Sequence, residues 1–262
     1  MKTLLKKIIR SVGLDLRRYR PGDEYDPGKR TMESVLANIR RIGFRPGTVV
    51  DVGVAGGTYA LYETFPEAKH LLVEPLKEFN PELEKICEKF DASYVNAAAG
   101  SEEAELSFNV HVEHLEGSSF YKEEMGASFD GEERKVQCKR VDKLVRERSL
   151  PGPYILKADV QGGELDVVDG AAEILDECEI IILEISTFYF MKGAPDLFDT
   201  AEYMKKKGYV IYDIFDLGER PLDGALAQMD IAFVKENGLF RTDHSFARAQ
   251  QWREMTGKTG EE

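Results

Sequence analysis

The sequence contains few cysteines. Cys87, Cys138 and Cys178 are odd in number, lie far apart and form no Cys-x-x-Cys pair. This usage is typical of a protein from a reducing compartment and not of a secreted protein held together by disulfides. No group of His and Cys residues has the spacing of a zinc site, so we predict no metal ligands.

Long apolar runs are also missing. No segment approaches the roughly 20 apolar residues that cross a bilayer, and the N-terminus has neither the apolar core nor the cleavage site of a signal peptide. Positive charge is in the minority, because the formal net charge is −13. A general nucleic-acid binder needs a basic face that displaces counterions from phosphates, so the composition argues against that class. We expect a cytoplasmic protein with no nucleic-acid partner.

The N-terminus is an exception to this acidic composition. Residues 1–20 hold seven Lys and Arg residues against one Asp. Apolar residues at 4, 5, 8 and 9 have helical spacing, which predicts a short basic amphipathic helix. Such a helix either lies on an anionic membrane surface or a partner, or folds back as a cap on the domain. The sequence leaves both interpretations open, and it carries no signal for an oligomeric state.

A glycine-rich turn at Val49–Thr58 organises the rest of the chain. Two β-branched residues precede it, Gly53, Gly56 and Gly57 interrupt it, and an apolar pattern resumes at Tyr59–Tyr62. This pattern predicts a buried strand that turns sharply into a helix. Glycines allow positive φ and close approach of a ligand, and the following helix offers unpaired N–H groups. We therefore expect a ligand site here.

The glycine spacing indicates which ligand. Dinucleotide sites typically have the motif Gly-x-Gly-x-x-Gly, whereas Asp51, Gly53 and Gly57 form Asp-x-Gly-x-x-x-Gly. The latter resembles the first motif of class I S-adenosylmethionine-dependent methyltransferases. A second strand, Lys69–Pro75, contains Glu74 about 20 residues after the first glycine, where doubly wound folds place a carboxylate on ribose hydroxyls. Glu74 is the predicted ribose ligand.

The segments that follow alternate between strand and helix. Residues 76–90 have helical apolar spacing, and residues 92–100 read as a third strand whose Asn96 is placed to meet the adenine end of a nucleoside. This alternation predicts a parallel sheet with right-handed crossovers. Residues 101–140 break the pattern, and we interpret them as a β-excursion whose polar middle forms a flap over the site. A solvated excursion with ordinary surface residues remains the alternative.

A second focal point lies at Lys157–Glu164. An apolar strand ends at Asp159 and passes through two glycines into a helix expected at 165–175, so Asp159 would stand at the carboxyl edge of the sheet, where open α/β folds bind ligands. A fifth strand, residues 179–186, carries Glu184 near its end. Both acids are candidate catalytic residues. A carboxylate can act as general base when its surroundings suit that role.

The remaining segments complete the sheet. A helix is expected at 196–207 and strands at 209–215 and 228–234, whose short connection fits an antiparallel pair. The predicted fold class is α/β, a doubly wound, mostly parallel seven-stranded Rossmann-like sheet with an antiparallel last strand and helices on both faces. We expect an N-terminal region at 1–46, the main domain at 47–237, and a C-terminal helix and tail at 238–262.

These motifs together resemble the FkbM-type methyltransferases. The resemblance rests on Asp51-Val52-Gly53 with Gly57, Glu74-Pro75, Asn96-Ala97-Ala98, the segment Lys157–Glu164, and Leu183-Glu184-Ile185-Ser186. The element Lys-x-Asp-x-x-Gly-x-Glu is the most specific of them. The sequence departs from the family pattern at Ala55, where the family often has Asn, and at Gln161, where it often has Glu.

The resemblance implies S-adenosylmethionine as methyl donor and O-methylation of a sugar, glycan or secondary-metabolite hydroxyl, commonly in bacteria. The cofactor-binding residues it implies are Asp51, Gly53, Ala55, Gly57, Glu74, Pro75, Asn96 and Ala97. The candidate substrate contacts are His114, Ser119, Gln161 and Glu164. Two alternatives remain, a nucleoside-binding protein without turnover and, against the glycine spacing, an NAD(P)-dependent oxidoreductase.

Overall fold

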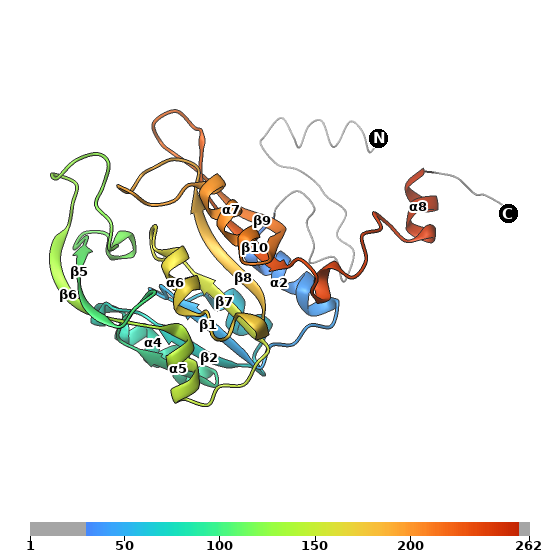
Figure 1. Ribbon diagram of the computed structural model, residues 1–262, viewed down its shortest axis with the longest axis horizontal. Coiled ribbons are helices and arrows are strands. Elements are labelled where there is room, and N and C mark those ends of the chain that lie inside the picture. Colours follow the sequence, from blue (N-terminus) through green and yellow to red (C-terminus); the bar gives the residue numbers. More distant parts are fainter. Residues whose placement is uncertain (1–29, 257–262) are drawn as a thin grey trace, which may run out of the picture.

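The computed structural model describes residues 30–256. Its framework is a seven-stranded sheet in the order β3-β2-β1-β7-β8-β10-β9, in which only β10 runs antiparallel to the others (Figure 1). The strands are β1 (Thr48–Val52), β2 (Lys69–Val73), β3 (Ala92–Val95), β7 (Tyr154–Ala158), β8 (Cys178–Ser186), β9 (Tyr209–Glu219) and β10 (Leu226–Lys235). The predicted fold class is confirmed. The predicted N-terminal amphipathic helix and the end of the tail lie outside the described residues.

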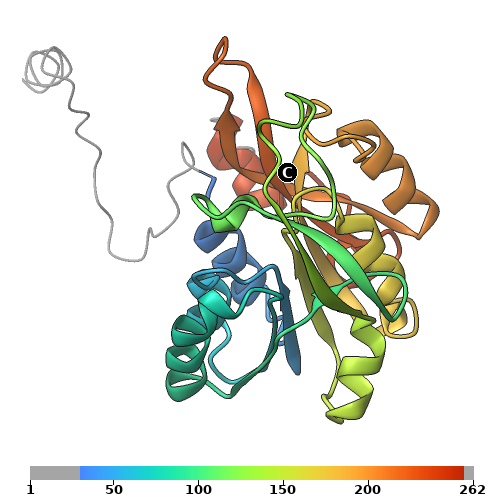
Figure 2. The ribbon, with the colours of Figure 1, turned by 90° about the vertical axis from the view of Figure 1, so that its left-hand side faces the viewer.

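Helices cover both faces of this sheet (Figures 1 and 2). Because side chains alternate along a strand, Val50 and Val52 face one apolar core and Val49 faces the other. The first core contains side chains of α5 (Val141–Glu147), α6 (Glu164–Gly170) and α7 (Leu197–Lys206). The second contains those of α2 (Met32–Arg41), α3 (Tyr59–Thr64) and α4 (Asn80–Lys89). The C-terminal helix α8 is Ala249–Thr256.

The start of α2 is fixed by two independent groups. Thr31 and Ser34 form a capping box, which satisfies N–H groups that a helix start leaves unpaired. The Asp216 carboxylate on β9 also accepts a hydrogen bond from the Met32 backbone N–H at 2.9 Å. The first described helix is therefore tied to the edge strand of the sheet, with Met32 at the carboxyl end of the central strands.

Strand register brings four charged residues to one face near the carboxyl edge of the sheet. Asp51 on β1 is the direct neighbour of Lys157 on β7, and Glu184 on β8 is the direct neighbour of Asp230 on β10. Each of the four lies two positions along its strand from a residue of the second core, and side chains two apart point to the same face. All four therefore point to the side of the sheet that α2, α3 and α4 cover. This row of charges forms the base of the functional site.

The prediction of one strand over residues 92–100 is wrong in its second half. The chain leaves the main sheet after Val95, and Ala98–Ala99 (β4) joins β5 (Ala104–Val110) and β6 (Glu132–Lys139) in a separate three-stranded sheet of order β4-β6-β5. The turn after Val95 has a physical cause, because the Asn96 side-chain amide donates to the Glu74 carbonyl and to Asn80. Residues 111–131, between β5 and β6, form the flap.

Two helical segments also differ from expectation. The helix expected from 165 to 175 ends at Gly170, and a 3₁₀ turn at Leu175–Glu177 follows it. Helix α5 has no counterpart in the predicted pattern, although Val141, Leu144 and Val145 are buried against the first core. Neither difference changes the order of the strands, so both leave the carboxyl edge of the sheet as predicted.

The turn after β1 packs directly against the turn after β7. Gly53 has a φ of +72°, and a Cβ at this position would lie 1.8 Å from the backbone oxygen of Asp159. The Asp159 backbone N–H in turn donates to the Val52 oxygen at 3.1 Å. Only glycine allows these two turns to approach so closely. At Gly56, by contrast, an added Cβ would have no neighbouring atom within 4 Å.

We expect Gly53→Ala to destabilise the protein by at least about 2 kcal/mol, because it adds a steric clash to an unfavourable φ. Gly56→Ala is the matched control and should stay within about 0.5 kcal/mol of wild type. Urea denaturation followed by circular dichroism measures both. Equal midpoints for the two variants would contradict the close approach seen here.

Candidate functional site

A cavity of about 520 Å³ opens at the carboxyl edge of the sheet. Its volume lies within the range of small-molecule sites. Strand ends and turns of β1, β2, β7, β8 and β10 line it from below, and the flap lines it from above. The predicted site residues that line it are Gly53, Ala55, Gly57, Glu74, Pro75, His114, Asp159, Gln161 and Glu184.

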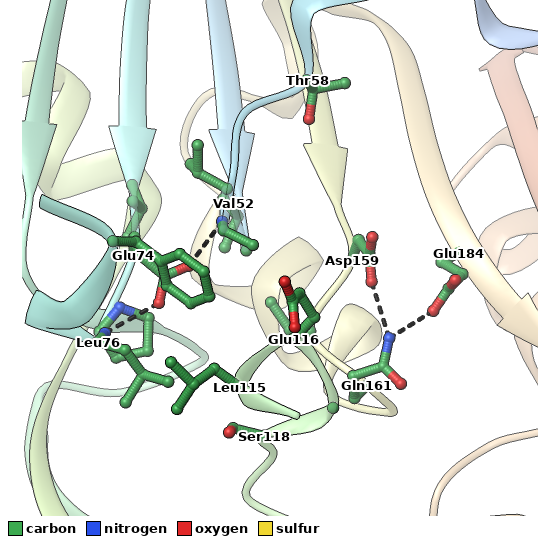
Figure 3. A pocket seen from close by; sticks show the side chains of 18 of the residues that line it. Val52, Thr58, Glu74, Leu76, Leu115, Glu116, Ser118, Asp159, Gln161 and Glu184 are labelled. Atoms are coloured by element: carbon green, nitrogen blue, oxygen red, sulfur yellow. Dashed lines mark hydrogen bonds between the residues drawn. The ribbon is translucent and has the colours of Figure 1, made fainter. Parts of the chain in front are cut away.

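Glu74 defines one end of the cavity (Figure 3). One of its carboxylate oxygens accepts the Ala55 backbone N–H at 3.0 Å, and the other accepts the Leu76 N–H at 2.9 Å. Burial raises the pKa of this carboxyl, and the two backbone bonds oppose that shift. Each oxygen keeps a further lone pair, so this rigid carboxylate can accept two hydroxyl hydrogen bonds from a ligand.

Beyond Glu74 the lining is apolar. Leu76 and Phe79 follow β2, and the second sheet and the flap contribute Phe108, Leu115 and Phe120. The rings of Phe108 and Phe120 pack edge to face with centroids 5.0 Å apart. This wall fits a flat, weakly polar ring.

The glycine turn forms the middle of the cavity. Gly53 to Thr58 line it, and the space beside Gly56 is open. Ala55 has a φ of +44°, a strained value for a residue with a side chain, and its N–H is held by Glu74. The turn thus offers bare backbone to a ligand in a conformation fixed by the neighbouring strand.

The opposite end of the cavity is acidic (Figure 3). The Gln161 side-chain amide donates to Asp159 at 3.0 Å and to Glu184 at 2.7 Å. The Gln228 amide donates to the same Glu184 oxygen at 3.2 Å. Gln161 has a φ of +57°, and its backbone carbonyl accepts a hydrogen bond from the Ser119 hydroxyl of the flap at 2.7 Å. The amides thus fix the relative positions of the two carboxyl groups.

Crowding of acids changes their protonation. Burial, with the neighbouring Asp159 charge, raises the pKa of Glu184 to about 9. Burial and Asp159 likewise raise the pKa of Asp230 to about 7. Burial also raises the pKa of Glu164 to about 7, against the opposing backbone N–H bonds from Val160 and Gly162. Burial and the proximity of the acids to one another thus favour the protonated forms of these three carboxyl groups.

Sequence reasoning missed Lys157 and Asp230, which both line the cavity. Lys157 belongs to the motif that carries the family resemblance, but the sequence pattern assigns it no role. It is 4% exposed, in a strand whose other residues are apolar apart from Tyr154. A charged residue in the middle of such a strand, two positions before Asp159, is the signal that could have identified it. The lone acid in the apolar strand β10 is the corresponding signal for Asp230.

Asp51 does not line the cavity. It is fully buried below the glycine turn, where the Tyr62 hydroxyl donates to one carboxylate oxygen. The other oxygen lies 3.5 Å from the Lys157 ammonium. Burial and the Asp51 charge both raise the pKa of Tyr62, so its hydroxyl remains a donor. In this structure Asp51 supports the turn from beneath.

Four other predicted site residues also lie outside the main cavity lining. The Asn96 side-chain amide donates to the Glu74 backbone carbonyl and to the Asn80 side chain, and Ala97 is buried beside it. Ser119 is buried and holds Gln161. Glu164 accepts the N–H groups of Val160 and Gly162 and so shapes the loop after β7.

Two features are absent from the part of the chain that the structure describes. Within residues 30–256 no group of three or more His, Cys, Asp or Glu side chains has the arrangement of a metal site. Among the helices of the same residues, none has the length and apolar character needed to cross a bilayer.

Comparison with known families and structures gives one family match. The model of the methyltransferase FkbM domain matches residues 51–211, more than half of the chain. No curated protein matches the sequence.

Solved structures similar to this chain include three methyltransferases. The precorrin-6y C5,15-methyltransferase of Geobacter metallireducens is 11% identical, with 78% of this chain and 87% of that chain covered and a TM-score of 0.42. A putative RNA methyltransferase of Pyrococcus horikoshii is 15% identical, with 88% of this chain and 98% of that chain covered and a TM-score of 0.43. The 1,6-didemethyltoxoflavin-N1-methyltransferase of Burkholderia thailandensis, solved with S-adenosylhomocysteine, is 14% identical, with 89% of this chain and 88% of that chain covered and a TM-score of 0.41.

The raised pKa of Glu184 predicts a pH-dependent stability difference. Folding favours the protonated carboxyl, so the stability from this group is complete below its unfolded pKa of 4.5 and is lost as pH rises through about 9. Glu184→Gln has no proton to lose. Its stability relative to wild type should therefore rise steadily from pH 5 to pH 9 in urea denaturation. The exposed Glu82→Gln serves as control, and a difference that does not change with pH would contradict the shift.

Proposed function

The chain belongs to the methyltransferase FkbM family and is an S-adenosylmethionine-dependent methyltransferase, and we propose that it methylates a hydroxyl group of a sugar, glycan or secondary metabolite. The observation that carries this proposal is the Asp159 carboxylate. Its side chain is 34% exposed, lines the cavity, and is held by Lys157 and Gln161. A fixed carboxylate that faces open space suits a general base for a hydroxyl.

The cavity residues fit the methyl donor in three parts. Glu74 can accept hydrogen bonds from the two ribose hydroxyls. The apolar wall of Leu76, Phe79, Phe108 and Phe120 suits the adenine ring, in place of the contact expected from Asn96. The open backbone beside Gly56 suits the methionine part. The acidic end, with more carboxyl groups than cations, favours a ligand that carries positive charge.

When bound, the donor supplies an electrophilic methyl group on a positively charged sulfur. Asp159 would accept the proton that the acceptor hydroxyl loses when its oxygen takes up this methyl group. Gln161 and Lys157 hold the Asp159 carboxylate in place, which lowers the entropic cost of reaching the reactive geometry. The flap residues His114 and Glu116 line the same cavity and are candidate acceptor contacts.

Replacing Glu74 tests the donor subsite. Glu74→Gln should weaken binding of both S-adenosylmethionine and S-adenosylhomocysteine by about 10-fold or more, because a carboxamide offers one acceptor oxygen in place of two. Isothermal titration calorimetry measures this loss. The control is Glu78→Gln, which removes an exposed carboxylate paired with Arg134 outside the cavity lining. Equal affinities for the two variants would rule out the ribose role.

Replacing Asp159 tests the reaction. With a panel of methyl glycosides and hydroxylated metabolites as acceptors, mass spectrometry should detect methyl ethers and an equal amount of S-adenosylhomocysteine. Asp159→Asn should keep donor affinity within a few-fold but lose about 10²–10⁴-fold in kcat, the usual contribution of a general base. Asp91→Asn, an exposed carboxylate paired with Lys69, is the control.

Two results would contradict the proposal. Full activity of Asp159→Asn would remove the general base from the mechanism. A wild-type protein that binds the donor but methylates nitrogen, sulfur or carbon acceptors and no hydroxyl would rule out O-methylation.

A further inference from the structure

Lys157 is a buried cation in the lining of the cavity. Its side chain is 5% exposed, and the ammonium nitrogen lies 3.1 Å from the Gly53 carbonyl oxygen. It is also 3.5 Å from one oxygen of Asp51 and 3.5 Å from one oxygen of Asp159. The ammonium donates a hydrogen bond to the Gly53 carbonyl and forms ion pairs with the Asp51 and Asp159 carboxylates. Lys157 therefore contacts the glycine turn, the buried acid below that turn and the acidic end of the cavity.

The surroundings keep this ammonium charged. Burial alone lowers the pKa of a lysine, but the charges of Asp159, Asp51, Asp230 and Glu184 outweigh burial and raise the pKa of Lys157. A permanent buried cation is unfavourable unless carboxylates compensate it. Lys157 and its acidic neighbours therefore depend on one another, and removing the lysine leaves the acids without their central partner.

Asp159 is surrounded mainly by acids. The charged and titratable groups that interact with it are Lys157 on β7, Glu184 on β8, Asp230 on β10 and Glu164 at the start of α6. Within residues 30–256, Lys157 is the cation that forms an ion pair with Asp159. Without it, the acids on these elements would favour the protonated form of Asp159.

We propose that Lys157 is a positioning residue that keeps the Asp159 carboxylate ionised and directed into the cavity while it anchors the glycine turn through Gly53. The relevance to catalysis rests on the proposed function, in which Asp159 is the base. The electrostatic role itself is a property of the ligand-free protein. It rests on the 3.5 Å ion pair between Lys157, near the end of β7, and Asp159, the first residue after this strand.

The direct test is a titration of the Asp159 carboxyl carbon by NMR in ligand-free protein labelled with ¹³C-aspartate, with the resonance assigned from Asp159→Asn. In Lys157→Met the titration midpoint should move upward by at least about one pH unit, because one close opposite charge shifts a carboxyl by about 1–3 units. Lys157→Arg keeps the charge and should restore most of the wild-type midpoint. The control Lys143→Met removes an exposed lysine paired with Glu103 and should leave it unchanged.

Lys157→Met leaves Asp51 buried without its cation, so a second comparison covers the case in which the variant fails to fold. Asp51→Asn combined with Lys157→Met removes both members of the buried pair. Measured against Asp51→Asn alone, the double variant should show the same upward movement of the Asp159 midpoint. An unchanged midpoint in either comparison overturns the proposal.

Calorimetric binding separates this inference from the proposed function. If wild type fails to bind S-adenosylmethionine, the proposed function fails while the NMR result still decides the role of Lys157. A different result would mean that Lys157 contacts the methyl donor directly and that the positioning role is wrong. In that case Lys157→Met weakens binding of S-adenosylmethionine and S-adenosylhomocysteine equally at every pH from 5 to 9, and the titration midpoint of Asp159 does not move.

Discussion

One buried ammonium group holds together an edge of the sheet that would otherwise repel itself. The carboxyl groups of Asp51, Asp159, Glu184 and Asp230 lie near one another because β1, β7, β8 and β10 are neighbours in the sheet. Ionised carboxylates this close repel one another, and this repulsion is one cause of the raised pKa of Glu184 and of Asp230. Lys157 lies among them, and its contact with the Gly53 carbonyl ties their charge to the shape of the glycine turn. The ligand site and the local stability of the fold therefore depend on the same interaction.

The sequence was sufficient for the main sheet because its strands are strongly patterned. Residues 178–186 are nearly continuous in apolar side chains, as a central strand should be, and the turns after residues 52 and 158 contain glycines at positions with positive φ. The segment after Val95 was not predictable in the same way. Ala97, Ala98 and Ala99 suit a strand in either sheet, and the choice depends on a side-chain hydrogen bond from Asn96 that no local pattern contains.

The site residues that directly follow a predicted strand could be predicted from the sequence, whereas those that reach the cavity through packing between distant segments could not. Glu74 and Asp159 come directly after apolar strands, and both line the cavity. Asp51 also follows apolar residues, but it lies within β1, where the Tyr62 hydroxyl of α3 donates to it and it does not reach the cavity. The apolar wall needs Phe108 and Phe120 from the second sheet and the flap, which meet Leu76 only through tertiary structure. Asp230 reaches the site because β10 runs in the opposite direction to its neighbours.

The two ends of the cavity are built from different parts of the chain. The end with Glu74 and the apolar wall, where we propose that the donor binds, uses residues 53–79 and 108–120, whereas the acidic end uses residues 157–161, Glu184 and residues 228–230. The acidic end includes β10, which pairs with β8 and β9 and is not hydrogen-bonded to β1 or β2. A substitution on β10 would therefore change the acidic end of the cavity while the backbone hydrogen bonds that hold Glu74 stay in place. The two ends of the cavity can be altered separately, apart from the link that Lys157 makes between them.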